Sequence, residues 1–200
     1  SDDRAVLQSF GGVADGKFPN RRLNGHEDSF DVIEFRAADD LAESPPVPTT
    51  LADIEPLDPA DATTTREFRL SGTNINRKDM DMERIDEAVT VGTSEIWEVR
   101  NVDGQAHNFH VHDVQFQVLD MDGNPPPPEL AGWKDTIAVP AGDEVRLIMR
   151  FADYTDDDTP YMFHCHILRH EDSGMMGQFV VVEPGDDVDE RLDVPGHHDH

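Results

Sequence analysis

Residues 164–175 read His-Cys-His-Ile-Leu-Arg-His-Glu-Asp-Ser-Gly-Met and contain the single cysteine of the chain, Cys165. In an extended strand, successive side chains point to opposite faces, so His164 and His166 share one face and Cys165 points to the other. Histidine and cysteine are side chains from which transition-metal sites are built. The alternation therefore predicts that one strand carries ligands for two different metal sites, back to back.

A second histidine cluster occupies residues 107–112, which read His-Asn-Phe-His-Val-His. His110 and His112 are two residues apart and are expected on the same face of a strand. Together with the two histidines that flank the cysteine, they make a set of four imidazoles on the face opposite the thiol. We interpret this set as half of an imidazole-only metal cluster.

The strand face to which Cys165 points is expected to carry a different set of ligands. His170 and Met175 lie beyond a turn after Cys165, and His107 opens the first cluster. Two imidazoles, one thiolate and a weak axial thioether describe a blue-copper electron-transfer centre. The neighbouring Met176 is suited to packing in the core, and the spacing favours Met175 as the ligand.

From Arg66 to Glu183 the pattern is typical of an antiparallel sandwich or barrel. Short alternating or apolar runs are separated by turn residues such as Asp103-Gly104 and Ala141-Gly142-Asp143. The predicted strands are 66–71, 94–101, 107–119, 135–139, 144–151, 160–167 and 177–183. We therefore predict an all-β fold.

Composition divides the chain into four parts. Residues 1–44 lack sustained periodicity apart from one strand candidate at 29–36. Residues 45–65 are rich in proline, which opposes both helix and central strand, so we predict an extended linker. The β domain occupies residues 66–183. Residues 184–200 form an acidic, histidine-containing tail with little apolar content, which we expect to be disordered.

The charge balance excludes several kinds of partner. Lys and Arg number 16 against 43 Asp and Glu, for a net charge of −27, and 36% of the residues are hydrophobic. Such a field repels phosphate backbones and anionic membrane surfaces, so no nucleic-acid partner is expected. In about 1 M salt the screening length falls to about 3 Å, which removes most carboxylate repulsion. The acidity therefore favours a halophilic source.

Two other classes of protein lack support in the sequence. No apolar run approaches the length of about 20 residues that spans a bilayer, so no membrane span is expected. The start, Ser1-Asp2-Asp3, has neither the basic nor the apolar region of a signal peptide, which an exported parent could already have lost. With one cysteine, no intrachain disulfide can form.

The two clusters resemble the copper motifs of the multicopper oxidases, the superfamily of laccase, bilirubin oxidase and spore-coat laccase. Residues 164–175 match the family pattern H-C-H-x3-H-x3-G-M at every defined position. Residues 107–112 resemble H-P-x-H-x-H, with Asn108 in place of a proline that is not a ligand. Residues 79–86 and 132–136 are also similar to the spore-coat laccase branch.

The resemblance covers roughly residues 66–183 and implies a Greek-key cupredoxin sandwich or barrel. Residues 29–36 resemble the closing strand of a preceding cupredoxin domain, so residues 1–44 are interpreted as the remnant of that domain.

The resemblance also implies a role for each ligand. The type 1 copper, which accepts electrons from a small reducing substrate, would be held by His107, Cys165 and His170, with Met175 axial. The type 2 copper would be bound by His110, and the type 3 pair, where dioxygen is reduced to water, by His112, His164 and His166. Electrons would pass from the cysteine through the backbone to its flanking histidines. Glu171 resembles a family acid that supplies protons near the trinuclear cluster.

One expected set of ligands is missing from this sequence. The family's trinuclear cluster uses eight histidines, and the chain supplies the C-terminal four. The other H-x-H, His198-Asp199-His200, lies in the polar tail without a strand pattern and is not expected to bind metal. We therefore predict the C-terminal part of an exported, laccase-like oxidase of phenols, aromatic amines or metal ions. Its N-terminal cupredoxin domains would complete the cluster, and this part alone would not reduce dioxygen.

Three alternatives remain open at this point. A stand-alone blue-copper electron-transfer protein needs only the ligands around Cys165 and leaves four aligned histidines unexplained. Copper nitrite reductases do not place histidines on both sides of the cysteine. A structural zinc module would show no strong blue absorption when copper is added.

Overall fold

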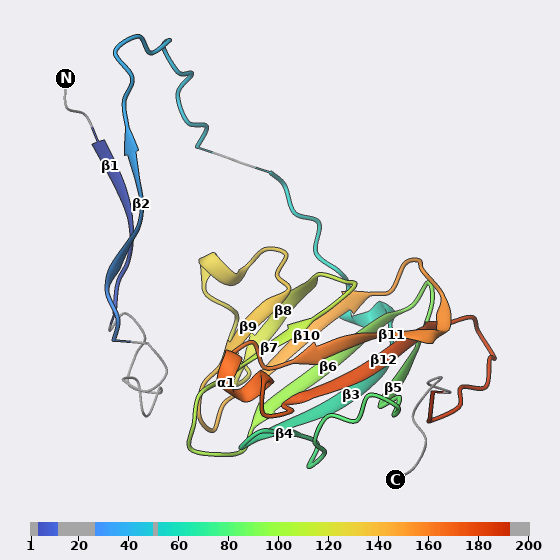
Figure 1. Cartoon of the computed structure of the whole chain (residues 1–200). Helices are drawn as coiled ribbons and strands as arrows, with labels where there is room; N and C mark the ends of the chain where they lie inside the picture. Colours follow the sequence, from blue (N-terminus) through green and yellow to red (C-terminus); the bar gives the residue numbers. More distant parts are fainter. Residues whose placement is uncertain (1–3, 12–26, 50–51, 193–200) are drawn as a thin grey trace. The chain divides into compact units, whose positions relative to one another are not determined.

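The structure, a computed structural model, describes residues 4–11, 27–49 and 52–192 and divides into two units between Ile54 and Glu55. In the first unit, β1 (Arg4–Ser9) pairs antiparallel with β2 (Phe30–Arg36) (Figure 1). Sequence analysis predicted the second strand and missed β1, which has no strict alternation of apolar and polar residues. All seven residues of β2 are exposed.

Within the described residues, the second unit contains two five-stranded sheets (Figure 1). The first has the order β4 (Asn74–Ile75), β3 (Ala62–Ser71), β6 (Ser94–Asn101), β10 (Glu144–Arg150) and β8 (Phe116–Met121). The second has the order β5 (Glu87–Thr90), β12 (Met176–Val182), β11 (Asp156–His164), β7 (His107–Val111) and β9 (Thr136–Val139).

Among the described residues of this unit, helical structure is limited to short turns: η1 (Pro59–Asp61), η2 (Pro128–Leu130) and α1 (Leu168–Glu171). No helix among the described residues is long and apolar enough to cross a membrane. The prediction of an all-β fold is confirmed.

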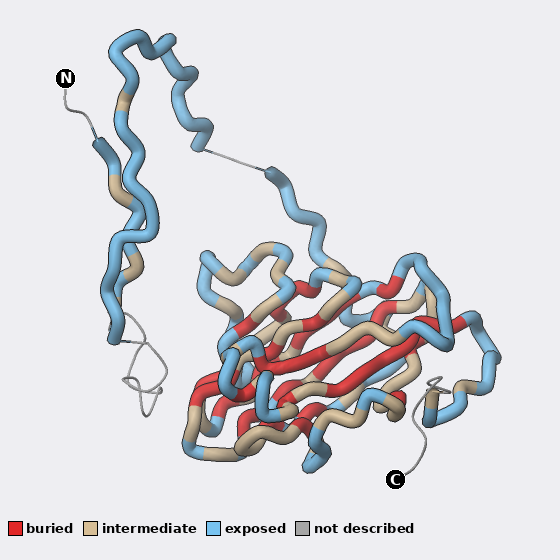
Figure 2. Tube along the Cα trace, viewed as in Figure 1, coloured by how far each residue is buried: buried red, intermediate tan, exposed pale blue. Residues whose placement is uncertain are grey.

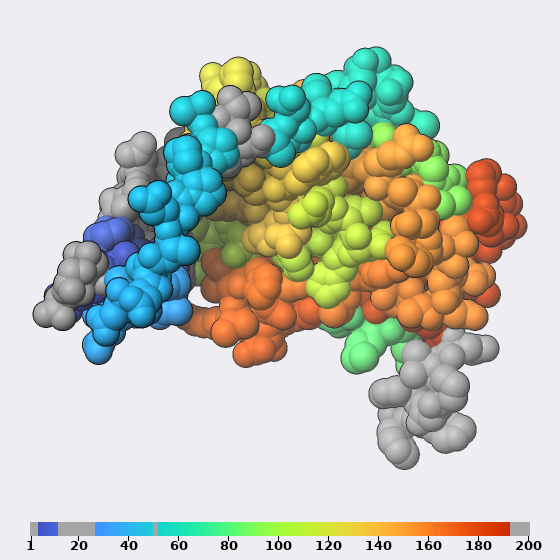
Figure 3. Space-filling model, turned by 90° about the horizontal axis from the view of Figure 1, so that it is seen from above, coloured from blue at the N-terminus to red at the C-terminus, as the bar shows by residue number. Residues whose placement is uncertain are grey.

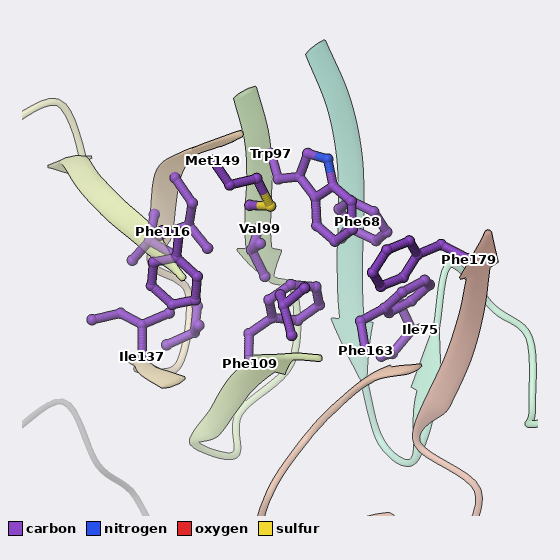
Figure 4. Packing of buried hydrophobic residues seen from close by; sticks show 14 of the residues in the cluster. Phe68, Ile75, Trp97, Val99, Phe109, Phe116, Ile137, Met149, Phe163 and Phe179 are labelled. Carbon is purple, nitrogen blue, oxygen red and sulfur yellow. The ribbon is translucent and has the colours of Figure 1, made fainter. Parts of the chain in front are cut away.

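An aromatic core lies between the two sheets, where the buried parts of the strands face one another (Figure 2). Phe68 and Trp97 come from the first sheet, and Phe109, Phe163 and Phe179 from the second (Figure 4). The Phe68 ring lies 4.6 Å from that of Trp97 and 4.9 Å from that of Phe163, centroid to centroid. Burial of rings of this size dominates the packing energy of a domain.

Several strand boundaries differ from the predicted ones because pairing across the sheet decides them. β3 begins at Ala62, inside the predicted linker, because residues 62–70 pair in parallel with β6. The predicted strand 107–119 is two strands, since the chain turns at Asp113, which has a φ of 71°. β5 was not predicted and pairs in parallel with β12.

Part of the tail that was predicted to be disordered pairs with the β domain. Ile85 donates its backbone N–H to the Glu190 carbonyl at 2.9 Å, and Leu192 donates to Glu83 at 2.7 Å. Val188 and Leu192 also pack on the small apolar cluster around Ile85. The prediction is therefore wrong for residues up to 192, while His198 and His200 lie outside the described residues.

The segment before β3 is held against its own unit by one buried glutamine. Gln117 on β8 accepts a hydrogen bond from the Leu57 N–H and donates to the Glu55 carbonyl. Figure 3 shows this segment, in teal, lying along the yellow-green surface of the same unit. The linker residues next to η1 are therefore ordered by specific hydrogen bonds as well as by their prolines.

Candidate metal centres

The pairing of β7 with β11 sorts the candidate ligands onto two sides of one sheet. His164 lies opposite His110, and Phe163 lies opposite Val111. The side chains of Phe163 and Val111 belong to the buried core, so the two histidines point to the other face. Cys165 directly follows β11 and, like Phe163, is buried on the core side.

The inner cluster consists of Cys165, His107 and His170, all buried. The cysteine Sγ lies 3.9 Å from His107 Nδ1 and 3.5 Å from His170 Nδ1, and the two Nδ1 atoms are 3.1 Å apart. A trigonal ion with bonds of about 2.0–2.1 Å to nitrogen and about 2.3 Å to sulfur separates its ligand atoms by about 3.5–3.8 Å. The three atoms therefore already converge as the ligands of a first-row transition metal would.

Met175 is fully buried beside this cluster. Its carbonyl accepts the Cys165 N–H at 3.1 Å, and its own N–H donates to the His170 carbonyl at 3.1 Å. Gly174, with a φ of 91°, makes the sharp return after α1 that this backbone pairing needs, in a region that side-chain-bearing residues rarely adopt. Met176 lies on β12 and is only partly buried.

The outer cluster consists of imidazoles. The Nε2 atoms of His112 and His164 are 3.2 Å apart, and the His110 ring lies 5.1 Å from each of theirs. The His166 ring is 5.2 Å from the rings of His110 and His164. All four predicted histidines therefore gather on one side of the sheet, with the ligand atoms of the first three within 4.8 Å of one another.

Hydrogen bonds determine which ring nitrogen of His110 is left with a lone pair that could bind a metal. Its Nδ1 lies 2.9 Å from the Asp135 carbonyl and 2.9 Å from Thr136 Oγ1, both on or beside the neighbouring strand β9. A carbonyl only accepts, so Nδ1 carries the proton and Nε2 keeps its lone pair. This is the arrangement by which a second hydrogen bond orients a metal-binding histidine.

Burial tunes the ionisation of both clusters. It lowers the pKa of His112, His164 and His170, with neighbouring histidines adding to the effect, so these rings are neutral and have free lone pairs near pH 7. Burial also raises the pKa of the Cys165 thiol. A metal that binds this cysteine must therefore displace its proton.

Glu171 lies on the outer side, at the end of α1. Its Oε2 is 3.6 Å from the Nδ1 atoms of both His164 and His166. Among the described residues no hydrogen-bond donor reaches this buried oxygen. A carboxylate at this distance acts electrostatically on both imidazole rings.

Sequence reasoning missed one polar neighbour of the inner cluster. Asp103 Oδ2 lies 3.1 Å from Nε2 of His107, and the aspartate had been recognised only as part of a turn. Burial alone would raise the pKa of Asp103, but hydrogen bonds from Gly72 and Gln105, and then from His107, lower it overall. The only signal was its position four residues before a ligand histidine, which a turn also explains.

Residues 45–185 match a family model described as multicopper oxidase. The chain is 37% identical over 172 residues to a laccase of Haloferax volcanii. The aligned region covers 77% of this chain and 29% of that protein. It is 40% identical over 125 residues to multicopper oxidase mco of Staphylococcus haemolyticus, covering 58% of this chain and 27% of that protein.

Solved structures give the same result. A multi-copper oxidase from Pediococcus acidilactici superimposes with a TM-score of 0.66 at 34% identity, over 82% of this chain and 35% of that one. McoA from Aquifex aeolicus superimposes with a TM-score of 0.69 at 27% identity, over 90% of this chain and 41% of that one. These neighbours confirm the predicted cupredoxin fold. The chain spans well under half the length of each of these relatives.

Proposed function

The chain belongs to the multicopper oxidase family, and from that premise we propose that it is the C-terminal part of a laccase-like copper oxidoreductase. The observation that carries the proposal is the placement of two ligand sets on opposite sides of one sheet. A buried thiol with two imidazoles lies on one side, and four imidazoles lie on the other. Single peptide bonds join Cys165 to His164 and His166, so the two sets share one short covalent connection.

We assign the inner set to a type 1 copper and the outer set to shares of type 2 and type 3 copper sites. The proposed inner ligands are His107, Cys165 and His170, with Met175 axial. The proposed outer ligands are His110 for type 2 and His112, His164 and His166 for type 3. Copper would supply one-electron oxidation of a phenol, aromatic amine or metal ion at the inner site and reduction of dioxygen to water at the outer site.

The chain's own residues have three tasks in this proposal. The buried surroundings of Cys165 would keep water from the thiolate and hold three ligand atoms in converging positions. His110 is held in one tautomer by the carbonyl of Asp135. Glu171 would hold a proton on Oε2 between His164 and His166, in reach of the outer site.

Four histidines are half of the set that the family uses, so we propose that N-terminal cupredoxin domains of the complete protein supply the others. Residues 1–44 would be the end of the domain that comes before. A stand-alone electron-transfer protein is less well supported, because it gives no role to the outer imidazoles. Export of the complete protein is likewise proposed from the family.

We also propose that the protein functions in concentrated salt. A net charge of −27 on 200 residues creates strong repulsion in dilute buffer, which salt screens. The melting temperature of the chain should therefore rise steeply as potassium chloride is increased to about 1 M, where the screening length is about 3 Å. A melting temperature that does not change with salt would contradict this part of the proposal.

Copper binding to the 200-residue chain tests the central assignment. Titration with copper(II) should produce an intense visible absorption from thiolate-bound copper, with one such copper per chain at saturation. Cys165→Ser should abolish this absorption, whereas the matched variant His164→Ala should keep it, because His164 is on the opposite side of the sheet. Absence of the band in the unaltered chain, or its survival in Cys165→Ser, would refute the assignment.

A further inference from the structure

Asn108 occupies the position in the first histidine cluster where the related copper motif has a proline. It lies on β7, directly after His107 of the inner cluster and two residues before His110 of the outer one. Proline has neither a backbone N–H nor a polar side chain, whereas asparagine has both. This chain therefore has hydrogen-bonding groups between its two clusters that the motif lacks.

The hydrogen-bonded ladder between β7 and β11 stops just before this residue. His112 donates its backbone N–H to the Met162 carbonyl at 2.9 Å, and β11 ends two residues later at His164. Hydrogen-bonded pairs recur at every second residue of an antiparallel ladder, so the next pair would join Asn108 with His166. That pair lies beyond the end of β11.

Side-chain atoms take the place of this missing pair. The His166 N–H donates to Oδ1 of Asn108. Burial raises the pKa of the Cys165 thiol, and hydrogen bonds to the sulfur from the backbone N–H groups of Asn108 and Ile167 partly offset that rise. Asn108 therefore reaches the chain beyond β11 through both its side chain and its backbone.

The peptide group that Asn108 holds joins the two clusters, because its carbonyl belongs to Cys165 and its N–H to His166. On the other side, the Cys165 N–H donates to the Met175 carbonyl at 3.1 Å. The segment is thus tied to β7 on one side and to the residue before β12 on the other. Cys165 Sγ lies 3.9 Å from Nδ1 of His107, the neighbour of Asn108.

We propose that Asn108 is a positioning residue that ties β7 to the Cys165–His166 peptide and so fixes both metal clusters through one side chain. The inference rests on the proposed function in one respect only, the identity of the bound metal. A variant without the acceptor oxygen should disturb both clusters together. The loss of a single ligand, by contrast, should affect only the cluster to which that ligand belongs.

The metal-free chain gives the first test, by NMR. The unaltered chain should show a scalar coupling across the hydrogen bond from the His166 nitrogen to the side-chain carbonyl carbon of Asn108. A coupling to the backbone carbonyl carbon of Asn108 instead would overturn the inference, whatever the metal.

Amide exchange then separates the acceptor from the shape of the side chain. Asn108→Leu keeps a similar shape without an acceptor, so the His166 N–H should exchange about 2–10-fold faster, the effect of one net hydrogen bond. The Cys165 N–H should keep its protection, because its partner is Met175. Asn108→Asp keeps an acceptor oxygen and should retain the slow exchange. Equal His166 rates in the unaltered chain and Asn108→Leu would contradict the role of Oδ1.

Copper gives the second test, in which each cluster is measured by itself. The inner site is followed by its thiolate–copper absorption, and the outer site by copper(II) affinity in a Cys165→Ser background. Asn108→Leu should shift the absorption band and weaken outer binding by about tenfold, the lower end of the usual cost of losing a group that orients ligands. Asn108→Asp should restore both properties.

Asn124→Leu is a matched control. The Asn124 side chain donates to the carbonyls of Met121 and Asp122 in a surface turn, so its loss should leave both copper measurements unchanged. If Asn108→Leu affected only one cluster, or neither, the inference would be wrong. Absence of thiolate-bound copper in the unaltered chain would instead refute the proposed function.

Discussion

His110 on β7 and His164 on β11 are directly opposed partners, with ring centroids 5.1 Å apart. The next pair, Val111 and Phe163, points into the core. A single step along the two strands therefore moves from the imidazole cluster to the hydrophobic interior, where Cys165 lies. The thickness of one sheet separates the two proposed copper sites.

This separation predicts that ligand variants act on one site at a time. His170→Ala should remove the thiolate–copper absorption and leave binding to the outer imidazoles intact, because the His170 Nδ1 faces Cys165 and His107. His110→Ala should do the reverse. Visible absorption and copper stoichiometry measure the two effects separately. If His110→Ala altered the thiolate band, the two sites would not be independent.

Gly177 on β12 is predicted to be intolerant of any side chain. A Cβ at this position would overlap Cζ of Phe163, an atom of a ring that is fixed in the aromatic core. Gly177→Ala should therefore lower the free energy of unfolding by about 1–3 kcal/mol, as overpacking does. Denaturant unfolding measures this. Gly104→Ala is the control, since a Cβ there would meet no atom within 4 Å; an equal loss in both variants would contradict the steric explanation.

Glu95 should contribute strongly to stability because, from β6, it binds Arg66 of the neighbouring strand β3 and the indole of Trp97 in the interior. Its side chain is 2% exposed and accepts hydrogen bonds from Arg66 and from Trp97 Nε1. Glu95→Gln removes the more buried of the two carboxylates that pair with the Arg66 guanidinium, Glu87 being the other, so we expect a loss of about 1–3 kcal/mol. In a double-mutant cycle with Arg66→Met, the two losses should not add.

The control for this cycle is an exposed pair in the same unit. Arg191 is 64% exposed where it meets Glu83, so Arg191→Ala should cost about 0–1 kcal/mol. Additive losses for Arg66 and Glu95 would show that the two residues do not form an energetic unit.

Asp156 gives a prediction for acid pH. Hydrogen bonds from the Asp158 N–H and from Thr159 lower its pKa below 3.8. A depressed carboxyl pKa adds stability above the unfolded pKa, and this stability is lost as pH falls through the folded value. Carbon NMR titration of the Asp156 carboxyl should find a midpoint below 3.8. Thr159→Pro, which removes one of the two backbone donors, should move that midpoint upward, and an unchanged midpoint would contradict the assigned cause.

Local patterns allowed much of the β domain to be predicted. β6 has the predicted bounds, 94–101, because its apolar residues and flanking turns lie within one short window. β5 was missed because its four residues carry little pattern of their own and depend on parallel pairing with β12. Residues 184–192 were misjudged for the same reason, since their partners, such as Glu83, lie about a hundred residues earlier in the sequence.

The sequence by itself predicted that Cys165 and its two neighbouring histidines point to opposite sides, because an extended backbone alternates its side chains. The structure keeps this alternation although β11 ends at His164, earlier than the predicted strand 160–167. Only the tertiary structure decided that His107 and His170 converge on the sulfur, and that Asp103 and Glu171 stand behind the two clusters. Those contacts join residues from separate strands and loops. Their positions are set by how two sheets pack, a long-range property that no short window of sequence contains.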